Sequence, residues 1–284
     1  MPWDRKLSCP VWSPSKPGMP QKMRFHRLAV FICLFLLVAP ACRRADLPAP
    51  PAAPGEERNG KDGASSKDSS IDALGPVGSA ARQLLRPQPF TEMVIEVAFV
   101  NGREPKSATL DHLKDEIGRA TQKTVTFDTH EIPGGRGSYS SEDIRNLSDS
   151  RRTKTSAPKA SVLLAFLDGR FAEDDQALGV AVAATVAAVF PDRIGSLSNL
   201  LQPGGVEQAV STHELGHILA LVNIGYESAS DREDPEHPNH SSNKSSVMYW
   251  AVETLSVADV FRGGPPDRFD EADIADLRML AGGS

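Results

Sequence analysis

The sequence predicts a mixed α/β fold, with one twisted mixed sheet backed by helices, and two observations lead to this expectation. Between residues 93 and 132, segments with the pattern of a strand, a helix and a strand follow one another. Between residues 160 and 222, further strand segments precede a long, largely apolar helix. Strands that alternate with helices form layered domains in which the helices pack on the sheet.

Three adjacent segments give the first elements. Residues 93–100 are mostly apolar and end at the turn pair Asn101-Gly102, which favours a strand. Residues 107–123 carry apolar side chains at helical spacing, which predicts an amphipathic helix. Residues 124–132 have the composition of a second strand and are followed by Pro-Gly-Gly.

The middle of the chain adds one helix and three strands. We expect a short polar helix over residues 141–149 and a buried strand over residues 160–167. Residues 178–190 are small and apolar, with Val and Ala alternating, which favours two strands joined by a turn.

Two helices and a polar loop complete the expected fold. Residues 206–222 carry a core-facing apolar stripe and predict a strong helix. Residues 223–247 are polar and predict a long loop. Asp270 is expected to cap a last helix that ends near Leu280.

Charge and proline divide the chain of 284 residues into unlike parts. Residues 1–86 carry 13 Lys and Arg against 7 Asp and Glu, and they hold 11 of the 22 prolines. Residues 87–284 carry 18 against 30, a net charge of −12, and are long enough for one sizeable core. An acidic body argues against a nucleic-acid-binding protein, which normally presents a basic face.

The first 42 residues have the features of an export signal. Arg24 and Arg27 precede an apolar run over residues 28–39, which is short for a membrane span and typical of a signal peptide. Ala39-x-Ala41 fits ordinary signal cleavage, whereas Cys42 directly afterwards resembles a bacterial lipoprotein cleavage box. The sequence therefore predicts an exported protein, secreted or periplasmic, or anchored to the cell envelope by a lipid on Cys42; an uncleaved anchor is the remaining alternative.

A tether and a cysteine-free body follow the signal. Residues 43–86 are rich in Ala, Pro, Ser, Gly and charge, and we expect them to form a disordered tether. The three cysteines are at positions 9, 33 and 42, so residues 87–284 contain none. The body therefore has no internal disulfide, thiol nucleophile or cysteine-zinc site.

The segment His213-Glu214-Leu-Gly-His217 carries the clearest chemical signal in the sequence. Two histidines four residues apart lie on one face of a helix, where both imidazoles can reach one metal ion. Glu214 can serve as the general base toward a metal-activated water. The uncharged surroundings and the continuous helix favour a zinc site over a chance pairing of histidines.

A catalytic zinc site usually has three protein ligands, so one more must come from elsewhere. His112 and His130 are expected to have ordinary structural roles, because one lies on the polar side of a helix and the other near a strand end. His237 and His240 lie in the polar loop that follows the motif. Asn223 would come close to the metal if the helix continued that far.

At this point the sequence resembles the metzincin metallopeptidases, which carry His-Glu-x-x-His-x-x-Gly-x-x-His and a methionine turn beneath the zinc. Here Ala220 stands at the Gly position and Asn223 at the position of the third His. Archaemetzincins have a more similar spacing, in which the third His is followed by Cys, four residues, Cys, one residue and the Met of the turn. Counting back from Met248, the present sequence has His240 at that third-His position and serine in place of both cysteines.

The resemblance implies a zincin-like catalytic domain with an active-site helix, His240 as the third zinc ligand and Met248 in the methionine turn. It also implies one Zn²⁺ per chain, because the cysteines of the family's second, structural zinc are missing. From the residues alone, the alternatives for the third ligand stay open. They are His237, Asn223 and a downstream glutamate such as Glu253 or Glu271.

Together these features predict an exported zinc endopeptidase that hydrolyses peptide bonds with Glu214 as general base. We expect a monomer that acts on a peptide or protein, does not bind nucleic acid, and holds its substrate extended along an edge strand within residues 178–190. The alternative is a catalytically inactive, peptidase-like binding module at the cell envelope. No residue favours this alternative, because the histidine pair and Glu214 are intact.

Overall fold

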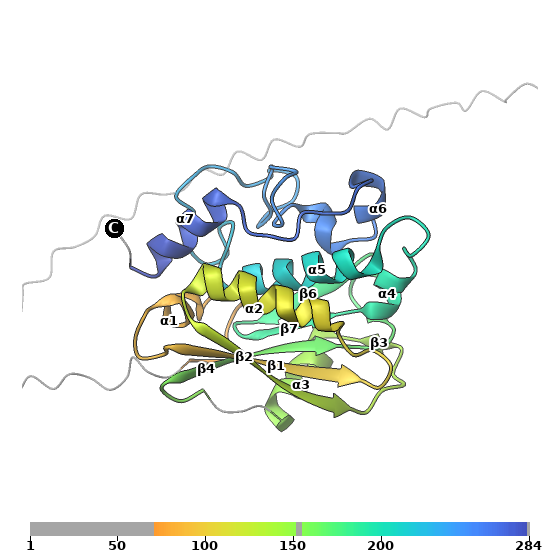
Figure 1. Cartoon of the computed structure of the whole chain (residues 1–284), viewed down its shortest axis with the longest axis horizontal. Coiled ribbons are helices and arrows are strands. Elements are labelled where there is room, and N and C mark those ends of the chain that lie inside the picture. The colour runs from red at the N-terminus through yellow and green to blue at the C-terminus, as the bar shows by residue number, and fades with distance from the viewer. Residues whose placement is uncertain (1–70, 152–154, 283–284) are drawn as a thin grey trace, which may run out of the picture. The chain divides into compact units, whose positions relative to one another are not determined.

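The computed structural model describes residues 71–151 and 155–282. In these ranges a five-stranded sheet has the order β2-β1-β4-β7-β6 (Figure 1). The strands are β1 (Glu92–Val100), β2 (Thr124–Ile132), β4 (Lys159–Phe166), β6 (Gly179–Ala183) and β7 (Val186–Val189). The pairs β2-β1, β1-β4 and β4-β7 are parallel, and β6 pairs antiparallel with β7 at the edge. The predicted mixed sheet is confirmed.

The central strands are buried on both faces. β1 and β4 are buried almost throughout, which is typical of parallel strands covered by helices on both sides. β2 forms the far edge and leaves most of its side chains exposed or half-buried. The strands predicted in this part of the sequence are confirmed to within one residue at each end, and β6 and β7 are the expected pair within residues 178–190.

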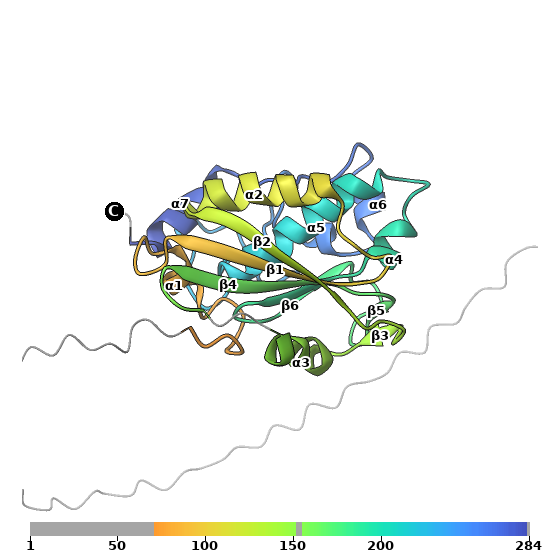
Figure 2. The ribbon, with the colours of Figure 1, turned by 60° about the horizontal axis from the view of Figure 1, so that its bottom comes forward.

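Helices cover the two faces unequally. α2 (Ser107–Thr121) and α5 (Pro203–Ile218) lie on one face, with α7 (Glu271–Leu280) beside α2, whereas α3 (Ser141–Arg151) lies on the other (Figure 1 and Figure 2). The apolar side chains accordingly form a larger core beneath α2 and α5 and a smaller one beneath α3. The predicted positions of α2, α3 and α7 are confirmed to within two residues at each end. Asp270 caps α7 as expected, because its side chain accepts a hydrogen bond from Asp273 N.

Short elements connect these layers. They are α1 (Ala81–Leu85), β3 (Ser138–Tyr139), β5 (Arg170–Phe171), α4 (Pro191–Gly195), η2 (Trp250–Glu253) and α6 (Val257–Val260). The polar segment between α5 and η2 forms no helix or strand, in agreement with the predicted loop. Among the residues that the structure describes, no helix has both the length and the apolar character of a membrane span.

Residues 71–86, which we expected to belong to the tether, are part of the folded body. Leu84 of α1 is fully buried in the larger core, and Ala184 N donates a backbone hydrogen bond to Gly75 O. The composition of residues 43–86 as a whole is polar, but residues 71–86 include a short apolar segment with enough surface to pack against the core. The boundary of the body therefore moves toward the N-terminus. The expected export signal and the rest of the tether, residues 1–70, lie outside the described residues.

The helix predicted over residues 206–222 both begins and ends earlier. It starts at Pro203, whose missing N–H and restricted φ suit the first turn of a helix. It ends at Ile218, because three of the next five residues take left-handed φ values, 66° at Ala220, 55° at Val222 and 66° at Asn223. Ala220 and Val222 are buried, so the packing of the turn outweighs helix propensity. The expectation that a continuing helix carries Asn223 toward a metal is wrong.

Candidate metal centre

The helix α5 supplies the buried part of the candidate site. His213 and His217 stand one turn apart, and their Nε2 atoms lie 2.9 Å from each other. Both are buried, as is Glu214, because α5 packs against β6, β7 and η2. His213 Nδ1 lies 2.7 Å from the carbonyl oxygen of Val247. An N–H at Nδ1 donates to that oxygen, which leaves the Nε2 lone pair for a metal.

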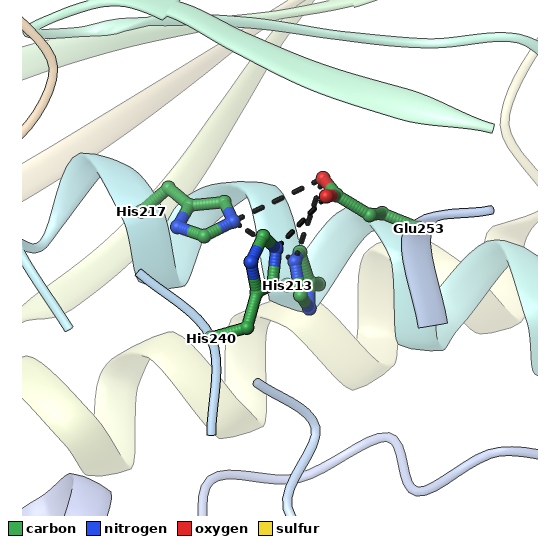
Figure 3. A group of neighbouring side chains, drawn as sticks. All are labelled: His213, His217, His240 and Glu253. Atoms are coloured by element: carbon green, nitrogen blue, oxygen red, sulfur yellow. Dashed lines mark hydrogen bonds and ion pairs between the residues drawn. The ribbon is translucent and has the colours of Figure 1, made fainter. Parts of the chain in front are cut away.

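The loop after α5 brings a third imidazole to the same point. The ring of His240 lies 5.3 Å from that of His213 and 5.0 Å from that of His217, measured between centroids. His240 Nδ1 lies 2.9 Å from the carbonyl oxygen of Pro238, so an N–H there donates to the backbone. The other ring nitrogen, Nε2, faces the histidine pair of α5 (Figure 3).

The carboxylate of Glu253 completes the cluster. Its Oε1 lies 2.8 Å from His240 Nε2, and its Oε2 lies 3.5 Å from His213 Nε2 and 3.9 Å from His217 Nε2 (Figure 3). One ligand atom from each of the four residues falls within 4.8 Å of all the others. The sequence offered Glu253 as an alternative to His240, whereas the structure brings both residues to the same place. Neither the spacing nor the periodicity of the sequence predicts that combination. His240 lies in the loop after α5, whereas Glu253 is the last residue of η2.

The other residues considered from the sequence lie outside this cluster. His237 stacks on Trp250, with ring centroids 4.2 Å apart. Asn223 donates its amide to a loop carboxylate, that of Glu233. Glu271 is exposed on the first turn of α7. His112, expected to have an ordinary role, lies with Nε2 2.8 Å from a backbone carbonyl oxygen.

Met248 is buried beneath the α5 histidines. A Cβ added at Gly216, between His213 and His217, would collide with the sulfur of Met248. Glycine at that position therefore lets the methionine side chain pack directly on the helix. The two serines that stand where the resemblance has cysteines, Ser241 and Ser246, are both buried and both make hydrogen bonds. Ser241 Oγ accepts a hydrogen bond from Asn243 N, and Ser246 Oγ donates one to Asp273, so both hydroxyl groups support the segment that leads to Met248.

A buried ion-pair network holds the loop in place. Arg232 places one guanidinium nitrogen 2.6 Å from Asp273 and another 2.6 Å from Asp276, both on α7. Ser241 N donates to Met248 O, and Asp234 N donates to His240 O at 2.7 Å. These bonds connect the loop to α7 and to Met248, so the position of His240 depends on contacts between residues far apart in the sequence.

Glu214 lies beside the cluster in an enclosed environment. Its carboxylate lies beside that of Glu253 and accepts a hydrogen bond from the backbone N–H of Ala181 on β6. A Cβ at Gly179, the first residue of β6, would fall 2.6 Å from Glu214 Oε1. Gly179 therefore makes room for the carboxylate at the start of the edge strand. This role of Gly179 is not among the sequence predictions, although a glycine that opens a strand is a signal of close approach.

Burial and neighbouring charge separate the pKa values of the two glutamates. Burial raises the pKa of Glu214 well above its usual range, and the adjacent Glu253 carboxylate adds to the rise. Burial would also raise the pKa of Glu253, but its contacts with His213 and His240 outweigh burial and hold it well below the usual range. Burial lowers the pKa of His217, so its imidazole is neutral, the form that binds metals.

The donor set fits a zinc ion. Imidazole nitrogen and carboxylate oxygen are among the ligands that zinc prefers, and no cysteine is needed. Ligands about 2.0–2.2 Å from an ion at tetrahedral angles lie roughly 3.3–3.5 Å apart. The Glu253 oxygens lie 2.8 Å, 3.5 Å and 3.9 Å from the Nε2 atoms of His240, His213 and His217, which is around that value. These four residues can therefore surround one ion with small adjustments of their side chains.

Archaemetzincins are among the solved structures to which this chain is similar. No family model and no curated protein matches the sequence. An archaemetzincin structure from Methanopyrus kandleri is 17% identical, with a TM-score of 0.45 over 68% of this chain and 97% of that chain. An archaemetzincin from Archaeoglobus fulgidus, complexed with malonate, is 17% identical, with a TM-score of 0.37 over 65% of this chain and 99% of that chain.

Proposed function

We propose that this protein is a zinc-dependent endopeptidase. The observation that carries the proposal is the convergence of three imidazoles beside Glu214, a buried carboxylate on the same helix as two of them. When bound, zinc would supply the Lewis acidity that activates a water molecule and polarises a carbonyl group. His213, His217 and His240 would hold the ion through their Nε2 atoms.

Glu214 would act as the general base and then as the general acid. Its carboxylate would accept a proton from the attacking water and return it to the nitrogen of the departing amine as the peptide bond breaks.

The edge strand β6 is the proposed binding surface for an extended peptide. It is one of the two edge strands of the sheet, and its first residue, Gly179, lies against Glu214. A peptide that pairs with β6 gains main-chain hydrogen bonds and passes beside the general base. This placement supports a peptide or protein substrate.

The test is Glu214→Gln in the full-length chain. The ligands are unchanged, so we expect one zinc per chain by elemental analysis. Digestion of an unbiased peptide library, followed by mass spectrometry, is expected to slow by about 10²- to 10⁴-fold because the base is lost. Hydrolysis near the wild-type rate would contradict the mechanism.

A second buried glutamate of α5 serves as the matched control. Glu207 accepts hydrogen bonds from Lys106 N and from the hydroxyl of Thr109, two turns before the motif. Glu207→Gln is expected to leave turnover per folded molecule unchanged. If the wild-type protein holds zinc and cleaves no peptide in the library, a catalytically inactive binding module becomes the better description.

We also propose that the body is exported, with a lipid anchor at Cys42 or as a free secreted or periplasmic protein. The support is the sequence of residues 1–42, which lie outside the described residues. Mass spectrometry of the mature N-terminus tests this proposal. Absence of residues 1–41 would support it, and an intact N-terminus would overturn it.

A further inference from the structure

We propose that Glu253 is a fourth protein ligand of the metal and that the resting site is closed, so that this carboxylate must withdraw before a substrate can reach the ion. The inference rests on the zinc site proposed above and concerns its regulation. Its basis is the position of the Glu253 carboxylate among the three imidazoles (Figure 3).

The carboxylate faces all three histidines at once. Its two oxygens lie between 2.8 Å and 3.9 Å from the Nε2 atoms of His213, His217 and His240. A side chain that only oriented one imidazole would need a single contact, at the nitrogen that faces away from the metal. Here the nitrogens that face away from it on His213 and His240 already have backbone carbonyl partners. Glu253 instead contacts the Nε2 atoms, which are the metal-binding atoms.

The backbone that carries Glu253 is attached to the sheet beside the proposed binding strand. Leu178 N donates to Glu253 O at 2.7 Å, and Leu255 N donates to Gln176 O at 2.9 Å. Ala177 and Thr254 form an isolated antiparallel bridge between these two bonds. Residues 253–255 therefore occupy the edge next to the start of β6. The same segment blocks the fourth metal position and the adjoining part of the peptide-binding edge.

The four side chains of the cluster differ in how much of each is exposed to solvent. The side chains of His213, His217 and His240 are 0%, 8% and 14% exposed, whereas that of Glu253 is 20% exposed. The Glu253 side chain is thus partly exposed, so solvent reaches the carboxylate that would have to withdraw. A catalytic zinc site keeps one position for water or substrate, and a site with four protein ligands does not. Rotation of the Glu253 side chain can open that position without breaking the backbone bonds to residues 176–178, which precede β6.

The test compares Glu253→Gln with Glu271→Gln in the full-length chain. Glu271 is the exposed glutamate of α7 and serves as the matched control. Zinc affinity is measured by competition with a chelator. The cobalt-loaded proteins are then titrated with acetohydroxamate, a small metal-binding anion, and their visible absorption spectra are recorded.

If Glu253 is a ligand, Glu253→Gln lowers zinc affinity by more than the roughly 10- to 100-fold that changes outside the ligand set produce. It also tightens acetohydroxamate binding by at least about tenfold and changes the cobalt spectrum, because a position on the metal has opened. Glu271→Gln changes none of these. A Glu253→Gln protein that matches the wild type in zinc affinity, spectrum and hydroxamate binding overturns the proposal.

A second variant covers the case in which Glu253→Gln fails to fold, and a parallel assay distinguishes this proposal from the proposed peptidase activity. If circular dichroism shows that Glu253→Gln does not fold, Glu253→Asp retains the charge but shortens the reach, and the same gain in hydroxamate binding is expected from it. Peptide hydrolysis is measured in parallel. A gain in hydroxamate affinity in Glu253→Gln with no hydrolysis by either protein would support the closed site and overturn the proposed peptidase activity.

Discussion

Two regions of the molecule supply the candidate metal ligands by different means. In α5, His213 and His217 come together because they are four residues apart on a buried helix. In the irregular segment after α5, His240 and Glu253 reach the same point only because loop contacts hold them there. Half of the ligand set thus depends on local geometry and the other half on tertiary contacts. The positions of His240 and Glu253 are therefore more sensitive than those of the α5 histidines to substitutions far from the metal.

The largest effect is expected from the ion pairs that hold the loop. Arg232→Met leaves Asp273 and Asp276 buried without their common partner, which costs about 3–5 kcal/mol of unfolding free energy. Urea denaturation measures this loss. Zinc affinity is expected to fall as well, because the loop carries His240. If stability fell and zinc affinity did not, the loop would not depend on α7 for its position at the metal.

Arg268→Met is the control for that variant. Arg268 also pairs with a buried carboxylate, that of Glu116, but its own side chain is 55% exposed. Glu116 keeps two other partners, Arg119 and the backbone N–H of Phe269. We therefore expect Arg268→Met to cost less than about 1 kcal/mol and to leave zinc affinity unchanged.

A smaller and more specific effect distinguishes the loop histidines. His240→Ala is expected to lower zinc affinity by roughly 10²- to 10³-fold, because it removes a ligand. His237→Ala and Asn223→Ala are expected to change it little, since those side chains contact Trp250 and Glu233 instead. Chelator competition on the three variants measures the difference. A large loss in His237→Ala, with none in His240→Ala, would mean that the loop adopts another arrangement when metal is bound.

The smallest effect is expected in the regular part of the molecule. Gln122 ends α2 in a left-handed conformation with φ 55°, and its side chain is exposed. Gln122→Gly removes that strain and is expected to raise stability by up to about 1 kcal/mol. Zinc affinity is expected to stay the same. A change in zinc affinity would show that the sheet layers and the metal site are coupled more closely than the contacts indicate.

The sequence by itself determined most of the sheet and the helical half of the site. Parallel strands buried on both faces are continuous apolar runs, and an amphipathic helix repeats its apolar residues at a constant interval. Both signals are local, so the strands, α2 and α7 agree closely with expectation. The pairing of His213 with His217 has the same origin, because a separation of four residues fixes their common face.

The tertiary structure alone decided where α5 ends, what becomes of residues 71–86, and that Glu253 joins His240 in one cluster. The turn at Ala220 follows from the packing of buried side chains against distant elements. Glu253 reaches the histidines because η2 is attached to the edge of the sheet beside β6. Such positions depend on contacts between residues far apart in the chain, which no short-range pattern encodes.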